Sequence, residues 1–218
     1  MKDKIKKVRF PQQSDKKIII GLSGGVDSAT LAVLAQRHYG SISAIYIDHG
    51  QKNSKKMEKA AISISKDFSF PLDIHSISPS KDRATETELR KLRFEIYNRE
   101  VIAKGNILLL GHHAGDRVET FFINLLRGTR LKGLGSIPED RGSIYRPMLG
   151  VPKNEILDYA KNNKIFYTED PSNSDEEILR NWIRRRLLPL LSERSNRDLQ
   201  DTVESISREI ESLKKEGE

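Results

Sequence analysis

The chain has 218 residues and a net charge of +7 at neutral pH, with 36% hydrophobic and 32% charged residues. This length and composition suit one soluble domain, or a domain with a small appendage. The chain has no cysteine, which excludes disulfide scaffolds, thiolate zinc sites, iron–sulfur clusters on cysteine ligands and cysteine nucleophiles. No apolar run approaches the roughly 20 residues of a membrane span, and the N-terminus lacks the apolar stretch of a signal peptide. We therefore expect a cytoplasmic protein that does not insert into membranes.

The positive charge is concentrated in two short segments. Residues 1–17 carry seven basic and two acidic side chains, and residues 180–197 carry six arginines and one glutamate. The segment 18–179 is nearly neutral at +1, and the tail 198–218 is acidic at −4. Basic patches suit a polyanionic partner, although a solvated lysine-rich terminus explains residues 1–17 equally well.

Apolar runs and helix-forming stretches alternate along the first 126 residues. The runs predict strands at 17–22, 42–47, 72–77 and 107–111, and the stretches that follow them predict helices at 27–35, 54–68, 85–104 and 116–126. Four such alternations predict an α/β fold, with a parallel sheet and helices on both faces. Ligands of such sheets bind beyond the carboxyl ends of the strands.

The remainder of the chain has a different pattern. Residues 128–150 are rich in glycine and have no clear periodicity, which predicts a long loop of the kind that is usually functional. Helices are predicted at 152–162, at 178–191 ending near Pro189, and at 195–215. We expect residues 1–150 to form the domain that contains the sheet and residues 151–218 a small C-terminal helical extension.

The segment Ser23 to Ser28 (SGGVDS) lies between the first strand and the first helix, where backbone N–H groups and the helix dipole attract phosphate. Gly24 and Gly25 let the backbone approach an anion closely, and the two serines can donate hydrogen bonds. The segment fits neither the Walker A pattern nor GxGxxG. A carboxylate at Asp27 would repel phosphate unless a cation lay between them, which indicates Mg²⁺. A plain glycine-rich turn before an acidic helix start is the alternative.

This hexapeptide resembles the SGGxDS loop of the N-type ATP pyrophosphatases, enzymes that split ATP between its α- and β-phosphates to adenylate a carbonyl oxygen. The resemblance implies a Rossmann-like sheet of the adenine nucleotide alpha hydrolase type, with 1–150 as the PP-loop domain. It also implies ATP and Mg²⁺ as cofactors. The loop alone does not identify the acceptor.

A second block, His112 to Thr120 (HHAGDRVET), falls where the fourth strand ends and the next helix begins. His112, His113, Asp116 and Glu119 are residue types that ligate metals, and the two acids lie one turn apart on one helical face. Histidines that only bond the backbone, beside an acidic helix start, are the alternative.

This block resembles the HHxxDxxET signature of the tRNA(Ile)-lysidine synthetase family. Other segments match that family's motifs in order between about residues 17 and 190: Ile47–Gly50 (VDHG), Leu89–Phe94 (AR-x-x-RY), Arg127–Thr129 (RGT), Arg146-Pro147 (RP), Glu169–Asn173 (ED-x-SN) and Arg180–Arg184 (RN-x-[IV]-R). Gly115 and Arg117 depart from the pattern, because many members carry Asp and Gln there. Many members also continue into C-terminal tRNA-binding domains.

In the resembled family, the wobble cytidine of an isoleucine tRNA with a CAU anticodon is adenylated, and free L-lysine then displaces AMP. The resemblance implies catalytic roles for Asp27, His112, His113, Asp116, Glu119 and Arg127. It implies nucleotide binding by Ser23, Gly24, Gly25, Val26, Asp27, Ser28, Asp48 and His49, with Mg²⁺ on Asp27 and Asp116. It places RNA contacts on Arg146, Arg180, Asn181, Arg184 and Arg185.

Several alternatives bear on this interpretation. The tRNA 2-thiocytidine synthetases share the loop but depend on cysteines, which this chain lacks. A NAD synthetase-like enzyme with a small acceptor, or a non-catalytic nucleotide-binding module, would leave the arginine-rich segment unexplained. Within that segment, Trp182 is either a stacking platform for a base or part of the core. The amphipathic stretch 195–215 is a candidate homodimer contact, although a role in capping the core is favoured.

Overall fold

The computed structural model describes residues 5–12, 15–50, 53–77, 85–135, 137–195 and 199–216. Within these ranges one mixed sheet forms the centre of the molecule, with the strand order β3-β2-β1-β4-β6-β5. All neighbouring strands are parallel except β5, which runs antiparallel to β6. The strands are β1 (Ile18–Gly21), β2 (Ser43–Asp48), β3 (Leu72–Ser76), β4 (Ile107–Leu109), β5 (Asp140–Arg141) and β6 (Ile144–Tyr145).

The central strand β1 shows why the sheet is buried on both faces. Ile18 and Ile20 pack into one hydrophobic cluster and Ile19 into the other, because successive side chains of a strand point to opposite faces. Ile19 is in register with Ser43 of β2 on one side and with Leu108 of β4 on the other. A run of β-branched residues without alternation is typical of such a strand.

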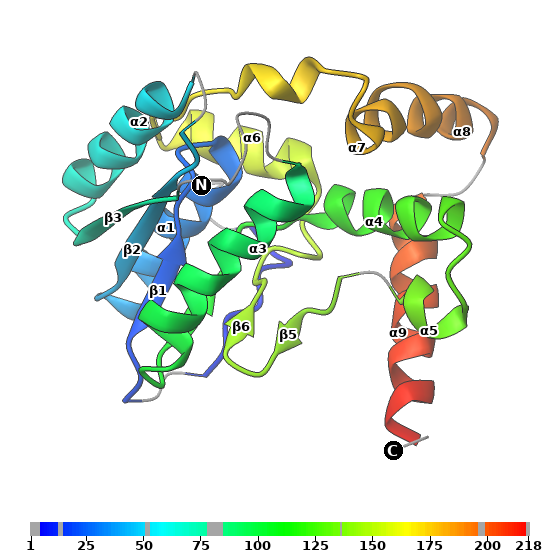
Figure 1. The fold of residues 1–218 in the computed structure, drawn as a ribbon, viewed down its shortest axis with the longest axis horizontal. Helices are drawn as coiled ribbons and strands as arrows, with labels where there is room; N and C mark the ends of the chain where they lie inside the picture. The colour runs from blue at the N-terminus through cyan, green and yellow to red at the C-terminus, as the bar shows by residue number, and fades with distance from the viewer. Residues whose placement is uncertain are drawn as a thin grey trace.

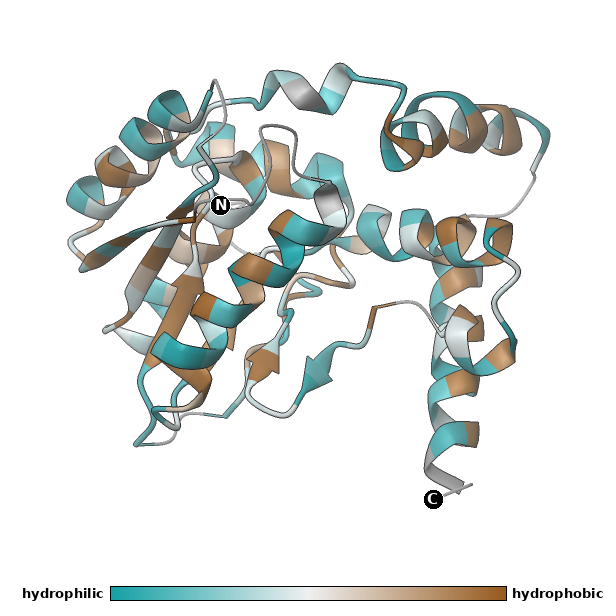
Figure 2. Cartoon of the chain, viewed as in Figure 1, coloured by the Kyte–Doolittle hydropathy of each residue, from teal (hydrophilic) through white to brown (hydrophobic). Residues whose placement is uncertain are grey.

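Helices cover both faces of the sheet (Figure 1). On one face lie α1 (Val26–Tyr39), α2 (Ser54–Asp67) and α6 (Lys153–Asn162), and on the other lie α3 (Glu86–Tyr97) and its π-helical continuation η1 (Asn98–Ile102). Figure 2 shows hydrophobic residues along the strands and on the helix sides that face them. The predicted α/β fold, with a parallel sheet and helices on both faces, is confirmed.

The prediction that residues 128–150 form a long loop is wrong in part. This stretch contains the short helix α5 (Leu131–Leu134) and both strands of the β5–β6 hairpin, which turns at Gly142 with a φ of +65°. β6 extends the parallel sheet, since Ile144 is in register with Leu108 of β4 and is buried. Two-residue strands are too short to show the alternation by which a strand is recognised, so the sequence pattern could not reveal them.

The C-terminal part is helical. The helix predicted at 178–191 runs as α7 (Leu179–Trp182), a π-helical turn η3 (Ile183–Leu187) and α8 (Leu188–Arg194), after a 3₁₀ turn η2 (Pro171–Ser174). Pro189 does not end this helix, contrary to the prediction. It lies in the first turn of α8, where a missing N–H costs little.

The last helix, α9 (Leu199–Glu216), packs on α4 (Ala114–Leu126) and α5 through Val203 and Ile210, which are buried. The start of the predicted helix, 196–198, lies outside the described residues, as does Arg197. The homodimer contact and the domain boundary at residue 150 stay predictions, although α6 packs on α1 of the sheet domain.

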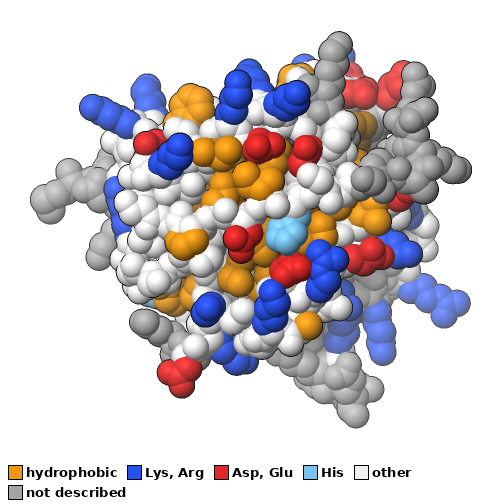
Figure 3. Space-filling view, turned by 60° about the vertical axis from the view of Figure 1, so that its left-hand side comes forward, with side chains coloured by type: hydrophobic (Ala, Val, Ile, Leu, Met, Phe, Trp, Pro, Cys, Tyr) orange, Lys and Arg blue, Asp and Glu red, His pale blue; other side chains and the backbone are white. Residues whose placement is uncertain are grey.

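The described helices include none that is both long and apolar enough to cross a membrane. Figure 3 shows the face that lies to the left in Figure 1. Hydrophobic, basic and acidic side chains are mixed there around a histidine, so charge of one sign does not dominate this face.

Candidate active site

The candidate site lies at the carboxyl ends of β1 and β4, where the strand order changes direction. β1 pairs with β2 on one side and with β4 on the other, and ligands of open α/β sheets bind in the crevice at such a switch point. Gly111, which follows β4, lets the segment after β4 approach the start of α1 closely. A Cβ on Gly111 would lie 3.0 Å from the backbone N of Ser28 and from the carbonyl carbon of Asp27.

The Ser23–Ser28 loop is held by its own hydroxyl groups. The backbone N–H of Ser23 donates to Oγ of Ser28 at 3.0 Å, the two serine hydroxyls lie 2.9 Å apart, and Oγ of Ser28 donates to the carbonyl of Gly25. Gly24 has a φ of +81°, and a Cβ there would lie 2.4 Å from the carbonyl oxygen of Met57. Only glycine tolerates both the positive φ and the close carbonyl oxygen. The first turn of α1 therefore presents its N–H groups to the crevice.

Asp27 has a partner that the sequence motifs did not indicate. Nζ of Lys153, at the start of α6, donates to both carboxylate oxygens of Asp27, at 2.6 and 2.8 Å. The two residues are 126 positions apart, so no local spacing connects them. The position of Lys153 is one indication of this contact, because a lysine in the first turn of a helix opposes the helix dipole and favours an acidic or anionic partner.

His113 and Asp116 form a capping box at the N-terminus of α4. Nδ1 of His113 accepts from the N–H of Gly115, and Oδ2 of Asp116 accepts from the N–H of His113. Because Nδ1 accepts, Nε2 is the ring nitrogen that can donate to a ligand. Nε2 is 3.8 Å from Oδ2 of Asp116 and 4.0 Å from Oδ1 of Asp27. The imidazole therefore lies between the two predicted metal-binding carboxylates.

The pKa values of this group follow from burial and from neighbouring charge. Burial alone would raise the pKa of Asp116, but His113, His112, the backbone N–H of His113 and Arg180 together hold it below the usual range. Burial lowers the pKa of His112 to about 3, with Arg146, Arg180 and Arg93 acting in the same direction against Asp116. His112 is therefore a neutral imidazole at physiological pH, and its buried Nδ1 has no hydrogen-bond partner among the described residues.

Asp48 and His49 lie at the carboxyl end of β2, beside the strand that carries the loop. Oδ1 of Asp48 accepts from the N–H of Gly50 at 2.8 Å. Burial and Arg93 lower the pKa of His49, and Asp48 and Asp170 oppose them. The structure thus brings the predicted nucleotide-binding residues of β1 and β2 to one edge of the sheet.

Glu119 lies one turn after Asp116 and anchors the C-terminal helices. Its side chain is 2% exposed, and its carboxylate accepts two hydrogen bonds from Arg184, at 2.5 and 2.9 Å. Nε of Arg180 lies 3.2 Å from the same carboxylate, and Nη2 of Arg180 donates to Oγ1 of Thr120. The catalytic role of Glu119 stays a prediction, and its contacts give it an anchoring role.

Other arginines of the predicted RNA-binding segment also bind acidic groups of the chain. Arg185 and Arg186 contact Glu176, at 3.3 and 2.9 Å, and both remain largely exposed. Asn181 is buried and donates to the carbonyl of Asp175. Trp182 is 40% exposed, so part of it is accessible.

Two further predicted residues, Arg127 and Arg146, lie at different distances from the crevice. Arg127 follows the last turn of α4, about 17 Å along the helix from Asp116, and the structure does not bring it to the crevice. Arg146 follows β6 and is buried, with Nη1 donating to the carbonyl of Pro138. Its charge contributes to the low pKa of His112, which places it near the crevice.

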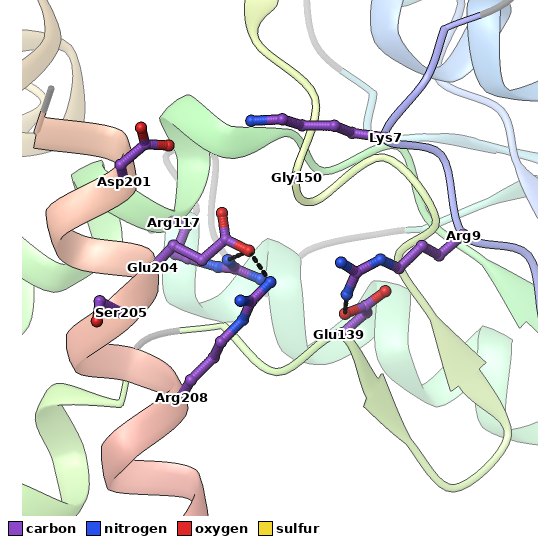
Figure 4. A pocket seen from close by; sticks show the side chains of 9 residues that line it. All are labelled: Lys7, Arg9, Arg117, Glu139, Gly150, Asp201, Glu204, Ser205 and Arg208. Atoms are coloured by element: carbon purple, nitrogen blue, oxygen red, sulfur yellow. Dashed lines mark hydrogen bonds and ion pairs between the residues drawn. The ribbon is translucent and has the colours of Figure 1, made fainter.

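Arg117, one of the departures from the family pattern, connects the core to α9. It is buried, and Nη1 lies 3.5 Å from Oε1 of Glu204, which also contacts Arg208 (Figure 4). Burial lowers the pKa of Arg117, and Glu204 opposes this shift. The cavity beside them measures about 380 Å³ and also contains the Arg9–Glu139 ion pair. Arg117 therefore contributes an ion pair between α4 and the last helix.

Two of the predicted carboxylates are suitable ligands for a magnesium ion. In the ranges that the structure describes, no three His, Asp or Glu side chains are grouped to hold a metal by themselves. Asp27 and Asp116 provide two carboxylates on either side of His113. Mg²⁺ is commonly held by one or two carboxylates together with phosphate oxygens and water, so these residues fit an ion shared with a bound nucleotide.

Comparison with known proteins places the chain in a family. The PP-loop domain model matches residues 1–191. The tRNA(Ile)-lysidine synthase of Bdellovibrio bacteriovorus is 33% identical over 214 residues, which cover 94% of this chain and 68% of that protein. This chain belongs to the PP-loop tRNA(Ile)-lysidine synthase family. Membership in this ATP-utilising family implies ATP binding.

The family members differ in length. The enzymes of Haemophilus ducreyi and Francisella philomiragia are 34% and 35% identical to this chain over 190 and 188 residues. These matches cover 85% and 83% of this chain but 44% and 47% of the relatives. The chain thus spans less than half the length of these two relatives.

Solved structures show the same fold. The U34-tRNA thiolase NcsA from Methanococcus maripaludis, described with its [4Fe-4S] cluster, has a TM-score of 0.75 at 19% identity. That match covers 91% of this chain and 73% of the thiolase. The NH3-dependent NAD synthetase of Campylobacter jejuni has a TM-score of 0.51 at 17% identity, covering 90% and 86% of the two chains.

Proposed function

We propose that this chain is an ATP-dependent ligase that forms lysidine on an isoleucine tRNA with a CAU anticodon. The C2 carbonyl oxygen of the wobble cytidine attacks the α-phosphorus of ATP, and pyrophosphate leaves. The ε-amino nitrogen of free L-lysine then attacks C2, and AMP leaves. One observation carries the proposal: the Ser23–Ser28 loop and the His112–Glu119 block face one crevice in a chain of this family.

The chain's own groups account for phosphate binding. The N–H groups at the start of α1 and the hydroxyls of Ser23 and Ser28 are the donors for the β- and γ-phosphates. Lys153 adds a positive charge beside Asp27 and can turn from the carboxylate to a phosphate oxygen. Bound Mg²⁺ on Asp27 and Asp116 would neutralise charge on the leaving pyrophosphate.

The two histidines suit the adenylation step as fixed hydrogen-bonding groups. His113 directs Nε2 between the two carboxylates and can donate a hydrogen bond to an α-phosphate oxygen. His112 stays uncharged because of its burial, so it can donate or accept without a change of protonation. Fixed donors aimed at developing charge are the main means by which enzymes stabilise phosphoryl transition states.

The lysine step needs a base, because an ammonium group cannot attack carbon. The carboxylates of Glu169 and Asp170 are candidates, since the N–H of the preceding Thr168 donates to the carbonyl of Gly24 at 3.0 Å. This bond holds the segment beside the loop. Glu119 is the other candidate, but both of its oxygens accept from Arg184, so it would have to release that side chain first.

RNA binding is assigned to the helical segment and to Arg146. Arg185 is about half exposed, and Trp182 offers an accessible ring for stacking with a base. Arg180, Asn181 and Arg184 position this segment from within. Since the reaction uses tRNA and free lysine, we propose the cytoplasm as its location.

The proposal is tested by measuring pyrophosphate release with and without tRNA and lysine. ATP–pyrophosphate exchange should require tRNA(Ile), and AMP release should require lysine as well. Asp27→Ala should abolish exchange, because the loop then lacks its cation-binding carboxylate. Exchange without tRNA, or retained exchange in Asp27→Ala, would contradict the proposal.

A further inference from the structure

A second cavity, of about 510 Å³, forms a groove between the α3–η1 helix and the β5–β6 hairpin. Its size is within the usual range of small-ligand sites. Four of the lining side chains are cationic and one is acidic. The cations are Arg90, Lys91, Arg141 and Arg146, and the acid is Glu95.

Arg146 is the buried cation of this groove. It is 5% exposed, and its buried Nε has no hydrogen-bond partner among the described residues. Burial and the charges of Arg90 and Arg141 lower the pKa of Arg146 to about 10. In the part of the chain that the structure describes, neither Arg141 nor Arg146 forms an ion pair. A buried guanidinium without a counter-charge is costly, and an anion in the groove would supply that counter-charge.

The lining of the groove is apolar between these charges. Phe94, Ile102 and Ile144 contribute side chains to it. The guanidinium of Arg90 lies over the ring of Phe94, 5.6 Å from its centroid, so the aromatic side chain lies next to a cation. An aromatic surface beside several cations matches the two halves of a nucleotide, a flat base and a charged phosphate.

The groove adjoins the reaction site. The N–H of Leu110 donates to the carbonyl of Tyr145, so Arg146 follows a residue that pairs beside the end of β4. The residues after Leu110 are Gly111 and His112, and Arg146 lowers the pKa of His112. Arg146 therefore belongs both to the groove and to the surroundings of the crevice.

We propose that this groove binds a neighbouring nucleotide of the RNA, with its base against Phe94 and its phosphate between Arg90, Arg141 and Arg146. The inference rests on the proposed function, since that function makes a single-stranded RNA loop the substrate. The charge favours this occupant over a neutral peptide segment, which would leave Arg141 and Arg146 without a counter-charge.

The test is the affinity of the full chain for a fluorescent tRNA(Ile) transcript, measured by anisotropy over a range of salt concentrations. Arg141→Ala should raise Kd about fivefold and reduce the slope of log affinity against log salt by about 0.7. Phe94→Leu keeps the groove apolar but removes the stacking face. It should raise Kd by a similar factor and leave the slope unchanged.

Arg99→Ala is the matched control. Arg99 lies on η1, is exposed and pairs with Glu100 outside the groove, so its loss should leave Kd within about twofold. If Arg141→Ala and Phe94→Leu bind like this control while the wild type forms lysidine, the groove assignment is wrong and the function stands. If both variants weaken RNA binding but the wild type attaches no lysine, the function is wrong and the groove stands. Competition by an acidic peptide with the same dependence on Arg141 and Phe94 would overturn RNA as the occupant.

Discussion

Glu119 gives the sharpest test of how the C-terminal helices are attached to the core. Its buried carboxylate faces Arg184 and Arg180, and Glu119→Gln would keep the shape of the side chain while removing its charge. Breaking a fully buried ion pair costs about 3–5 kcal/mol. Because Arg180 is 24% and Arg184 38% exposed, water replaces part of the lost interaction. We therefore expect a loss of about 2 kcal/mol in the free energy of unfolding.

For a chain of this size, that loss lowers Tm by about 4–8 °C. Far-ultraviolet circular dichroism reports the whole chain, and the fluorescence of Trp182, the only tryptophan, reports α7. The fluorescence transition should move at least as far as the dichroism transition, because α7 carries Arg180.

Glu176→Gln is the control for this measurement. It removes the same charge, but its partners Arg185 and Arg186 are 49% and 64% exposed, so the cost should stay below about 1 kcal/mol. Equal and small decreases in Tm for the two variants would refute the anchoring role of Glu119.

Three further predictions concern the crevice. Gly24→Ala should cost more than about 3 kcal/mol of stability, or abolish ATP binding measured by titration calorimetry, because the new methyl group meets the carbonyl of Met57; wild-type stability and affinity would be inconsistent with the loop geometry. Lys153→Met should change Tm by less than about 3 °C but lower the Mg²⁺ concentration needed for half-maximal exchange, because Asp27 loses a competing cation; a higher requirement would refute this reasoning. The pKa of His112 is about 3 in the folded chain against an ordinary 6.5, so the unfolded chain binds more protons between these values and stability falls as pH falls through this window. His112→Asn should flatten the dependence of Tm on pH between about 6 and 4.5, and an unchanged slope would contradict the assignment.

The features that could be predicted from the sequence depend on residues that lie close together in the chain. The β-branched run of β1 and the glycines of the loop identify a strand and a phosphate-binding turn because burial and backbone sterics act within a few residues. The Lys153–Asp27 and Arg184–Glu119 pairs connect positions 126 and 65 residues apart, and no periodicity records such contacts. The β5–β6 hairpin was missed because its strands have two residues each.

The candidate site likewise contains residues whose positions could be predicted from the sequence and others whose positions could not. Asp27, His113 and Asp116 follow strand ends, and their side chains lie near one another, as the rule that parallel strands end at one edge predicts. Arg127 lies next to the same block in sequence, but α4 carries it about 17 Å away. Proximity in sequence along a helix therefore overestimates proximity in space.

The most direct test of the proposed function is the attachment of radiolabelled lysine to tRNA(Ile) by the purified chain. Label should appear in the tRNA only when ATP and Mg²⁺ are present, and nuclease digestion should recover it at the wobble cytidine with one AMP released for each lysine attached. Release of AMP and pyrophosphate without lysine incorporation, or with ammonia as an equally good acceptor of the activated group, would contradict the account.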